Sequence, residues 1–159
     1  MAVPDVFFAA VNSGNLTLAR SILDEDGELI SARDEHGSSP LRIAVEADNL
    51  ELVSFLLERG ADPNAPDDHG YRPLHVAKSL KAAEMLVQHG ADVNAKDNYG
   101  LIPLHNAVLE GYGDIAEFLI EKGADIHTKE NKGWTPLEMA VQYHLPEIEA
   151  MLRRHGAQH

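Results

Sequence analysis

DEHGSSPLRIAVEADNLELVSFLLERGADPNA, residues 34–65, decides the fold, because its landmarks return three more times along the chain. Its Pro-Leu pair at 40–41 recurs at 73–74, 103–104 and 136–137, and its Gly-Ala pair at 60–61 recurs at 90–91, 123–124 and 156–157. A third landmark, Gly37, recurs as Gly70, Gly100 and Gly133, three residues ahead of each Pro-Leu pair. Self-similarity with a period of roughly 20–50 residues indicates a repeat architecture in which each unit stacks on its neighbours.

Each repeat predicts a turn followed by two helices. The polar turn at 34–37 needs a glycine where the backbone takes a positive φ, and the following proline suits the first turn of a helix. Residues 40–47 have the apolar spacing of a short inner helix, and residues 50–60 that of a leucine-rich outer helix that ends at Gly60 as a left-handed cap. Neither helix can bury its apolar stripe alone. Neighbouring units are therefore expected to share a continuous core.

The same stretch resembles the ankyrin-repeat family, whose pattern D-x-x-G-x-T-P-L-H-x-A…L-E-x-V-x-x-L-L-x-x-G-A-D-x-N-A it follows almost position for position. The resemblance implies an all-α ankyrin-repeat solenoid of stacked helix-turn-helix units joined by β-turn fingertips, about five units including the caps. It covers the whole chain as one domain, 1–159. The expected divisions are an N-terminal cap at 1–33, repeats at 34–66, 67–96 and 97–129, and a C-terminal capping repeat at 130–159.

Two departures from the family pattern predict local differences. Three residues are missing between Pro73 and Gly90, so we expect a shortened inner helix or a shortened start of the outer helix in the repeat 67–96. The signature T-P-L-H reads SPLR, RPLH, IPLH and TPLE, so no unit carries both its threonine and its histidine. This loss predicts one unmade hydrogen bond per unit, with a net value of about 0.5–1.5 kcal/mol each. In the last unit Arg153 and Arg154 end the outer helix, as suits a terminal repeat that faces water.

The composition narrows the choice of partners. Twenty-six acidic residues against 13 lysines and arginines give a net charge of −13, which opposes binding to nucleic acid. A partner with a basic surface would be attracted, although an acidic balance also serves solubility alone. The chain has no cysteine, which favours a reducing compartment, and it has no apolar stretch near the roughly 18 residues that a membrane span needs. We expect a cytoplasmic monomer with no membrane segment.

Residues for catalysis or metal binding are not evident. His36 and His69 occupy matching turn positions on adjacent repeats, whose helices should stack about 8–10 Å apart, too far to share one zinc ion. His75 and His105 match the structural histidine of the family. No G-x-S-x-G, glycine-rich phosphate loop or H-E-x-x-H motif occurs. We therefore expect no enzyme activity, no cofactor and no metal. The aspartates Asp62, Asp92 and Asp125 are interpreted as turn-stabilising carboxylates.

The resemblance implies a partner-binding concave surface formed by the turn tips and the exposed side of the inner helices. Large side chains at these positions would be surplus to a core already filled by leucine, alanine and valine, and aromatic residues are frequent hot spots. Our candidate partner-binding residues are Tyr71, Tyr99, Leu101, Leu109, Trp134, Tyr143, His36 and His69. The alternative is that residues such as Trp134 and Leu101 fold back and merely seal the stack.

The function expected from the resemblance is a non-catalytic protein–protein interaction module, that is, an adaptor, scaffold or inhibitor of another protein. The alternative is an acidic effector or immunity-type regulator that acts by charge, through the repeats 34–66 and 97–129 with net charges of −5 and −4. Self-association is a further possibility. Asn64 and Asn94 also resemble ankyrin asparagines that an animal oxygen-sensing dioxygenase hydroxylates, but asparagine at these places equally suits a turn.

Overall fold

The computed structural model describes residues 3–158, which form two compact units that divide between Ala91 and Asp92. The first unit contains α1 (Val3–Asn12), α2 (Leu16–Glu25), the 3-10 helix η1 (Gly27–Ser31), α3 (Pro40–Glu46), α4 (Leu50–Glu58), the 3-10 helix η2 (Pro73–Val76) and α5 (Leu80–Gln88). The second unit contains α6 (Pro103–Leu109), α7 (Gly113–Glu121), α8 (Pro136–Gln142) and α9 (Pro146–Arg154). Over residues 3–158 no β-strand is found.

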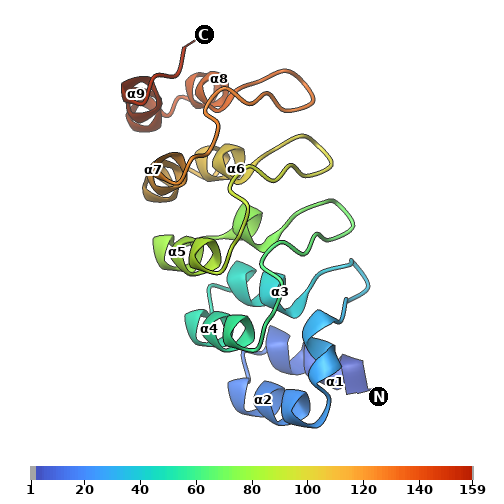
Figure 1. Cartoon of the computed structure of the whole chain (residues 1–159). Helices are drawn as coiled ribbons and strands as arrows, with labels where there is room; N and C mark the ends of the chain where they lie inside the picture. Colours follow the sequence, from blue (N-terminus) through green and yellow to red (C-terminus); the bar gives the residue numbers. More distant parts are fainter. Residues whose placement is uncertain (1–2, 159) are drawn as a thin grey trace. The chain divides into compact units, whose positions relative to one another are not determined.

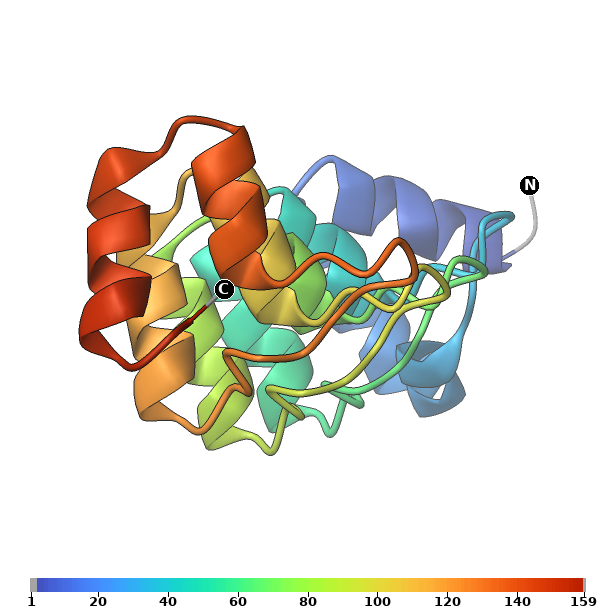
Figure 2. The same cartoon turned by 90° about the horizontal axis from the view of Figure 1, so that it is seen from above.

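Each repeat consists of a turn, a short inner helix and a longer outer helix, as the sequence predicts. In the second unit the inner helices α6 and α8 lie side by side, and each carries its outer helix, α7 or α9, on the side away from the turns (Figure 1). Figure 2 shows α8 beside α9 and the loop before α8 extending away from the pair. The turns and the outer helices therefore occupy opposite sides of the inner helices in this unit.

Proline and glycine set the helix boundaries. Proline stands in the first turn of α3, α6 and α8. Gly60 takes φ +86° just after Arg59, the C-cap residue of α4, and Gly37 takes φ +73° in the turn before α3. Gly37 also makes a close approach, because a Cβ atom there would lie 2.3 Å from Asp68 Oδ1. The recurring glycines of the turns and of the outer-helix ends thus supply the positive φ that the repeat requires. The glycine of the turn also allows neighbouring turns to touch.

The repeat 67–96 has a shortened inner helix, the first of the two expected outcomes. The element η2 has four residues and 3-10 geometry, whereas the outer helix α5 keeps nine residues. Ser79 caps α5 by accepting the N–H of Ala82, and its hydroxyl donates to Asp48 Oδ1 at 2.6 Å. Asp48 itself has φ +51° at the end of α3. The link that lost three residues is therefore held to the preceding repeat.

The side chains that cap the inner helices correct one expectation. In the RPLH and IPLH turns, His75 and His105 accept the N–H of the residue three positions earlier, and the hydroxyl cap is absent. In the TPLE turn, however, Glu138 accepts the N–H of Thr135 while the Thr135 hydroxyl accepts the N–H of Glu138. The prediction of one lost bond in every unit is therefore wrong for the last unit, because glutamate replaces histidine as the acceptor.

Aliphatic side chains form the core of each unit. Leu41, Leu52, Leu56 and Leu86 are fully buried in the first unit, and Leu104, Leu119, Leu137 and Leu152 in the second. Burying each leucine contributes about 1.5–3 kcal/mol relative to leaving it exposed, which makes the helix stack the main source of stability.

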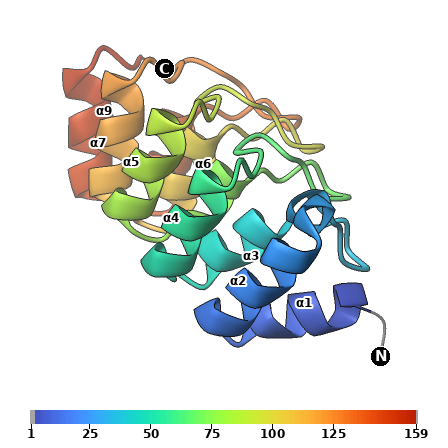
Figure 3. The ribbon, with the colours of Figure 1, turned by 60° about the horizontal axis from the view of Figure 1, so that its bottom comes forward.

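The outer helices α2 and α4 of the first unit lie side by side (Figures 1 and 3), and arginine side chains link them. The guanidinium groups of Arg20 and Arg59 lie 4.5 and 5.0 Å from the ring centre of Phe55, and Arg59 also forms an ion pair with Asp24 of α2. These contacts join α2 to α4. The helix pair expected within 1–33 is present, whereas η1 is an element that the sequence patterns did not predict.

Candidate interaction surface

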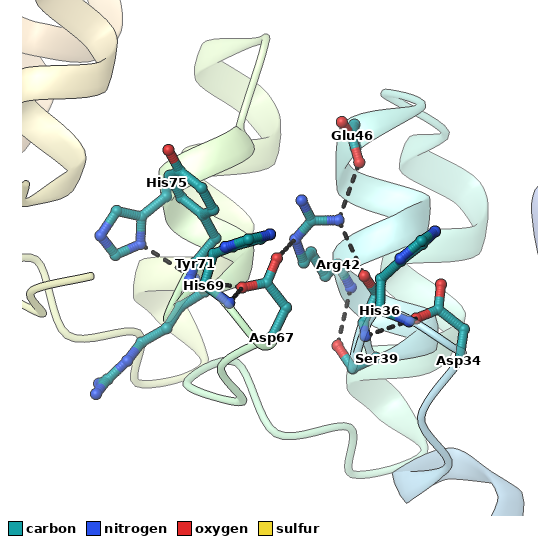
Figure 4. Close-up of polar contacts among 11 residues, drawn as sticks. Asp34, His36, Ser39, Arg42, Glu46, Asp67, His69, Tyr71 and His75 are labelled. Carbon is teal, nitrogen blue, oxygen red and sulfur yellow. Dashed lines mark hydrogen bonds and ion pairs between the residues drawn. The ribbon is translucent and has the colours of Figure 1, made fainter. Parts of the chain in front are cut away.

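An ion pair organises the turns of the first unit (Figure 4). Arg42 Nε of α3 lies 3.1 Å from Asp67 Oδ2, and Arg42 Nη1 lies 3.0 Å from Glu46 Oε2. The same Nη1 donates to Ser38 Oγ at 3.3 Å. The other carboxylate oxygen of Asp67 accepts the N–H groups of His69 and Tyr71. Arg42 stands where the family has histidine, and it connects its own helix to the next turn by charge.

The candidate residues of the first unit lie along these turns. His36 and His69 are exposed at the turn tips, and the N–H of Asp68 donates to the carbonyl oxygen of His36 at 3.2 Å. Tyr71 is half-buried, and its ring lies edge-on to His75 with 5.9 Å between the ring centres. The adjacent turns are thus in direct contact, and Tyr71 has part of its ring committed to packing.

A histidine organises the turns of the second unit. The His105 side chain is fully buried, and its Nδ1 accepts the N–H of Ile102 at 3.2 Å. Its Nε2 must then carry the hydrogen, and it lies 3.3 Å from the carbonyl oxygen of Trp134. The turns themselves meet where the N–H of Asn131 donates to the carbonyl oxygen of Tyr99 at 2.9 Å. The repeats are joined here by neutral hydrogen bonds.

Burial lowers the pKa of His105 below its ordinary value of 6.5. The carbonyl groups of Trp134 and Thr128 and the carboxylates of Glu130 and Asp97 act in the opposite direction without reversing the shift. The ring is therefore neutral at pH 7, as its two hydrogen bonds require. This makes His105 a structural residue in agreement with the interpretation of its motif.

Four of the candidate side chains of the second unit are exposed to solvent. Trp134 and Tyr99 are 37% and 49% exposed at the turns, and Leu109 and Tyr143 are 37% and 56% exposed at the ends of the inner helices. Leu101, the fifth candidate of this unit, is half-buried. The four exposed residues come from adjacent turns and from the packed helices α6 and α8. They supply apolar surface that the core does not use.

Sequence reasoning missed two residues of interest. Val141 of α8 is 38% exposed, whereas Val45 and Val108 at the matching positions are fully buried. Arg42 was noted only as a departure from histidine, and the Asp67 carboxylate across the repeat is a partner that periodicity alone does not reveal.

The aspartates and asparagines of the outer turns have structural contacts. Asp62, Asp92 and Asp125 each accept the backbone N–H two residues ahead, which confirms their interpretation as turn-stabilising residues. The N–H of His127 lowers the pKa of Asp125 by donating to its carboxylate. Asn64 Nδ2 donates to the carbonyl oxygen of Gly90 in the next repeat. Asn94 uses both amide atoms, since Nδ2 donates to the carbonyl of Gly123 and Oδ1 accepts the N–H of Asp125.

Throughout residues 3–158, no three histidine, aspartate or glutamate side chains are grouped closely enough to hold a metal ion. None of the helices in the same part of the chain has the length and apolar character needed to cross a membrane.

Two models of known protein families match the chain. Residues 6–97 match a family model described as ankyrin repeats in three copies, and residues 86–140 match one described as ankyrin repeats in many copies. The chain belongs to the ankyrin-repeat family. The all-α ankyrin-repeat fold expected from its motifs is thereby confirmed. Ankyrin repeats are generally protein–protein interaction modules.

The chain matches several curated proteins over part of their length. Residues of the chain are 40% identical over 76 positions to the transient receptor potential cation channel subfamily A member 1 of Homo sapiens, covering 46% of the chain and 7% of that protein. Potassium channel AKT1 of Arabidopsis thaliana is 41% identical over 69 positions, covering 43% and 8%. Ankyrin repeat and SAM domain-containing protein 6 of Mus musculus is 36% identical over 75 positions, covering 46% and 8%. The matched stretch thus spans less than a tenth of each relative.

Proposed function

We propose that this ankyrin-repeat chain is an adaptor, scaffold or inhibitor that binds another protein through its turn tips and the exposed side of its inner helices. The observation that carries the proposal is the exposure of Tyr99, Leu109, Trp134 and Tyr143 on adjacent turns and helices of the second unit. Tryptophan and tyrosine bury large areas at low conformational cost, and they dominate the energetics of many interfaces. The exposed turn tips His36 and His69, with Tyr71, are the corresponding positions of the first unit.

The packing of α8 supports a role for Trp134 and Tyr143 outside the core. Leu137 and Ala140, which lie on this helix between the two aromatics, are fully buried and fill its inward face. The aromatic residues stand just before and just after the helix, and they keep more than a third of their surface in contact with water. Their removal should therefore leave the core intact while it weakens an interface by about 2 kcal/mol or more per residue.

The proposal includes a monomer in a cytoplasmic location and a single ankyrin-repeat domain with 1–33 and 130–159 as caps. The channel names of two relatives describe those much longer proteins, and the repeats that they share with this chain do not identify its partner.

The test is capture of partners from a lysate with the wild type, with the double substitution Trp134→Ala and Tyr143→Ala, and with Leu18→Ala. Leu18 is a matched control because it is 39% exposed on α2 of the first unit and belongs to none of the candidate positions. We expect a partner retained by the wild type and by Leu18→Ala to be lost by the double variant, with helix content unchanged in circular dichroism. Equal retention by all three proteins would contradict the proposal.

A second function rests on charge. The acidic segment 34–66 has a net charge of −5, which favours a regulator that attracts a basic partner. Such a partner would associate at a rate that falls steeply with ionic strength, because charges separated by more than about 8–10 Å are screened near physiological salt. An association rate that is insensitive to salt between about 20 and 150 mM would exclude this mechanism.

A further inference from the structure

The ring of His105 holds two segments of the second unit together. Its Nδ1 accepts the N–H of Ile102, the N-cap residue of α6, and its Nε2 donates to the carbonyl oxygen of Trp134 in the next turn. The same carbonyl accepts the N–H donated by residue 130 across the turn. The turn 130–134 is therefore tied to α6 through one buried ring.

Both hydrogen bonds depend on the neutral form of that ring. A proton added at Nδ1 converts this acceptor into a donor, which then faces another donor, the N–H of Ile102, at 3.2 Å. Because the two nitrogens are fixed in one rigid ring, a rotation that separates Nδ1 from Ile102 also moves Nε2 away from Trp134. Full burial leaves no water to take up the lost bonds.

Charged groups come close to the ring from the turns on either side of α6, and others lie on the helices α7 and α8 that pack against it. Asp97 and Glu130, from the turns before and after α6, are the carboxylates that favour the charged form. On α7, Asp114 accepts the N–H of Ile115, Glu117 pairs with Arg154 and His155, and Glu121 is exposed. On α8, Glu138 accepts the N–H of Thr135.

The Asp97 carboxylate is an alternative partner for the protonated His105 ring. Its Oδ1 accepts the N–H groups of Tyr99 and Leu101, but Oδ2 is buried and has no hydrogen-bond partner among the described residues. A protonated imidazole that turns away from Ile102 gains attraction from this carboxylate at the expense of its bond to Trp134. The arrangement therefore has two alternative sets of interactions, one for each protonation state of the ring.

We propose that His105 is a pH-sensitive tie whose protonation releases the turn 130–134, and with it Trp134, from α6. The turn 67–71 of the first unit is held instead by the Arg42–Asp67 ion pair, in which no histidine takes part. Acidification below pH 6.5 thus loosens the Trp134 turn through His105. The consequence for partner binding rests on the proposed function, whereas the release itself does not.

Trp134 is the only tryptophan of the sequence, so its fluorescence reports on this turn without labelling. We expect the emission of the wild type to change on acidification from pH 7.5, with a midpoint below 6.5 and at constant far-ultraviolet circular dichroism. Nuclear magnetic resonance of the imidazole should give the same midpoint for His105, and the amide signals of 130–134 should move with it.

Two variants decide whether His105 is the cause. The amide of His105→Gln can reproduce the Nε2 donor to Trp134 and does not titrate, so the pH-dependent emission change should disappear. The control His75→Gln replaces the matching histidine of the first unit, whose Nδ1 accepts the N–H of Arg72, and it should keep the change. An unchanged transition in His105→Gln overturns the proposal, as does a flat emission in the wild type.

The outcome remains decisive if His105→Gln does not fold. In that case an imidazole of His105 that titrates in the wild type while the amide signals of 130–134 stay still overturns the proposal. An intact pH-dependent release of Trp134 combined with partner binding that ignores pH would instead count against the proposed binding surface. The two failures are therefore distinguishable.

Discussion

Arg42 Nε lies 3.1 Å from Asp67 Oδ2, and the two side chains are only 14% and 4% exposed. The pair joins α3 to the turn of the following repeat and is withheld from water. Removing one partner of such a pair is costly because the remaining charge has lost its hydration without compensation. Arg42 and His105 occupy the same position of their repeats. The contact with the next turn is therefore made by an ion pair in the first unit and by the neutral ring of His105 in the second.

Substitution of Arg42 tests that dependence. We expect Arg42→Met to lower the free energy of unfolding by about 3 kcal/mol, because Asp67 is left charged and buried. Adding Asp67→Asn should recover a large part of the loss, since the amide oxygen can still accept the N–H groups of His69 and Tyr71. Urea denaturation of the single and double variants measures both effects.

The control for this prediction is Lys81→Met. Lys81 lies 3.5 Å from Glu84 and is 62% exposed, so the pair should contribute less than about 1 kcal/mol. Similar losses for Arg42→Met and Lys81→Met would show that burial of the Arg42 pair has no special effect.

The turn glycines provide a second test of how closely neighbouring repeats approach. Gly60→Ala should cost roughly 1–2 kcal/mol, because its φ of +86° is unfavourable for alanine while no atom lies within 4 Å of the added Cβ. Gly37→Ala adds a collision with Asp68 Oδ1 at 2.3 Å, and we expect it to cost about 1–3 kcal/mol more. Thermal unfolding of the two variants gives the comparison, and equal costs would mean that Asp68 moves aside freely.

The pKa of His105 predicts how stability varies with acidity. Burial holds the folded-state pKa below 6.5, so the unfolded chain binds more protons as the pH falls past 6.5. The contribution of His105 is therefore complete above about pH 6.5 and is lost as the pH falls toward the folded-state pKa, by at most about 1.4 kcal/mol per pH unit.

The difference between urea denaturation of the wild type at pH 7.5 and at pH 5.5 should shrink in His105→Gln. A wild type that becomes more stable over this acid interval, with the variant unaffected, would reverse the predicted sign.

Substitution of Asn94, in the outer turn, should weaken the contact between two neighbouring repeats. Asn94→Ala removes the donor to the carbonyl of Gly123 and the acceptor for the N–H of Asp125. Each net hydrogen bond contributes about 0.5–1.5 kcal/mol, so we expect the unfolding free energy to fall by about 1–3 kcal/mol and the Asp125 amide to exchange faster. Gln88→Ala, at the exposed end of α5, serves as the control and should change neither quantity. Unchanged exchange at Asp125 in Asn94→Ala would contradict the role of Asn94.

The fold was predictable because its signals are local and repeated. Pro40 and Gly60 mark where a helix begins and ends in any environment, since proline lacks an N–H and glycine accepts a positive φ. The deletion between Pro73 and Gly90 predicted a shortened helix for the same local reason. The element η1 was missed because residues 27–31 carry no proline, no repeat match and no long apolar stripe.

The candidate surface was predictable only at the level of position. The repeat register placed Trp134 and Tyr143 at the ends of an inner helix, but it could not state that Tyr71 would share its ring with His75 or that Leu101 would be half-buried. Such contacts depend on side-chain orientations, which the repeat register does not specify. The Arg42–Asp67 pair shows the same limit, because its partners are 25 positions apart and belong to different turns.

The short link of the repeat 67–96 has a consequence for engineering. Ser79 caps α5 and at the same time donates to Asp48 of the preceding repeat. Restoring the three missing residues to reach the regular family length would separate Ser79 from Asp48 while Asp48 kept its positive φ. A consensus redesign of this protein should therefore either retain the deletion or replace residues 48 and 79 together with it. The short link and these two residues depend on each other through the hydrogen bond between them.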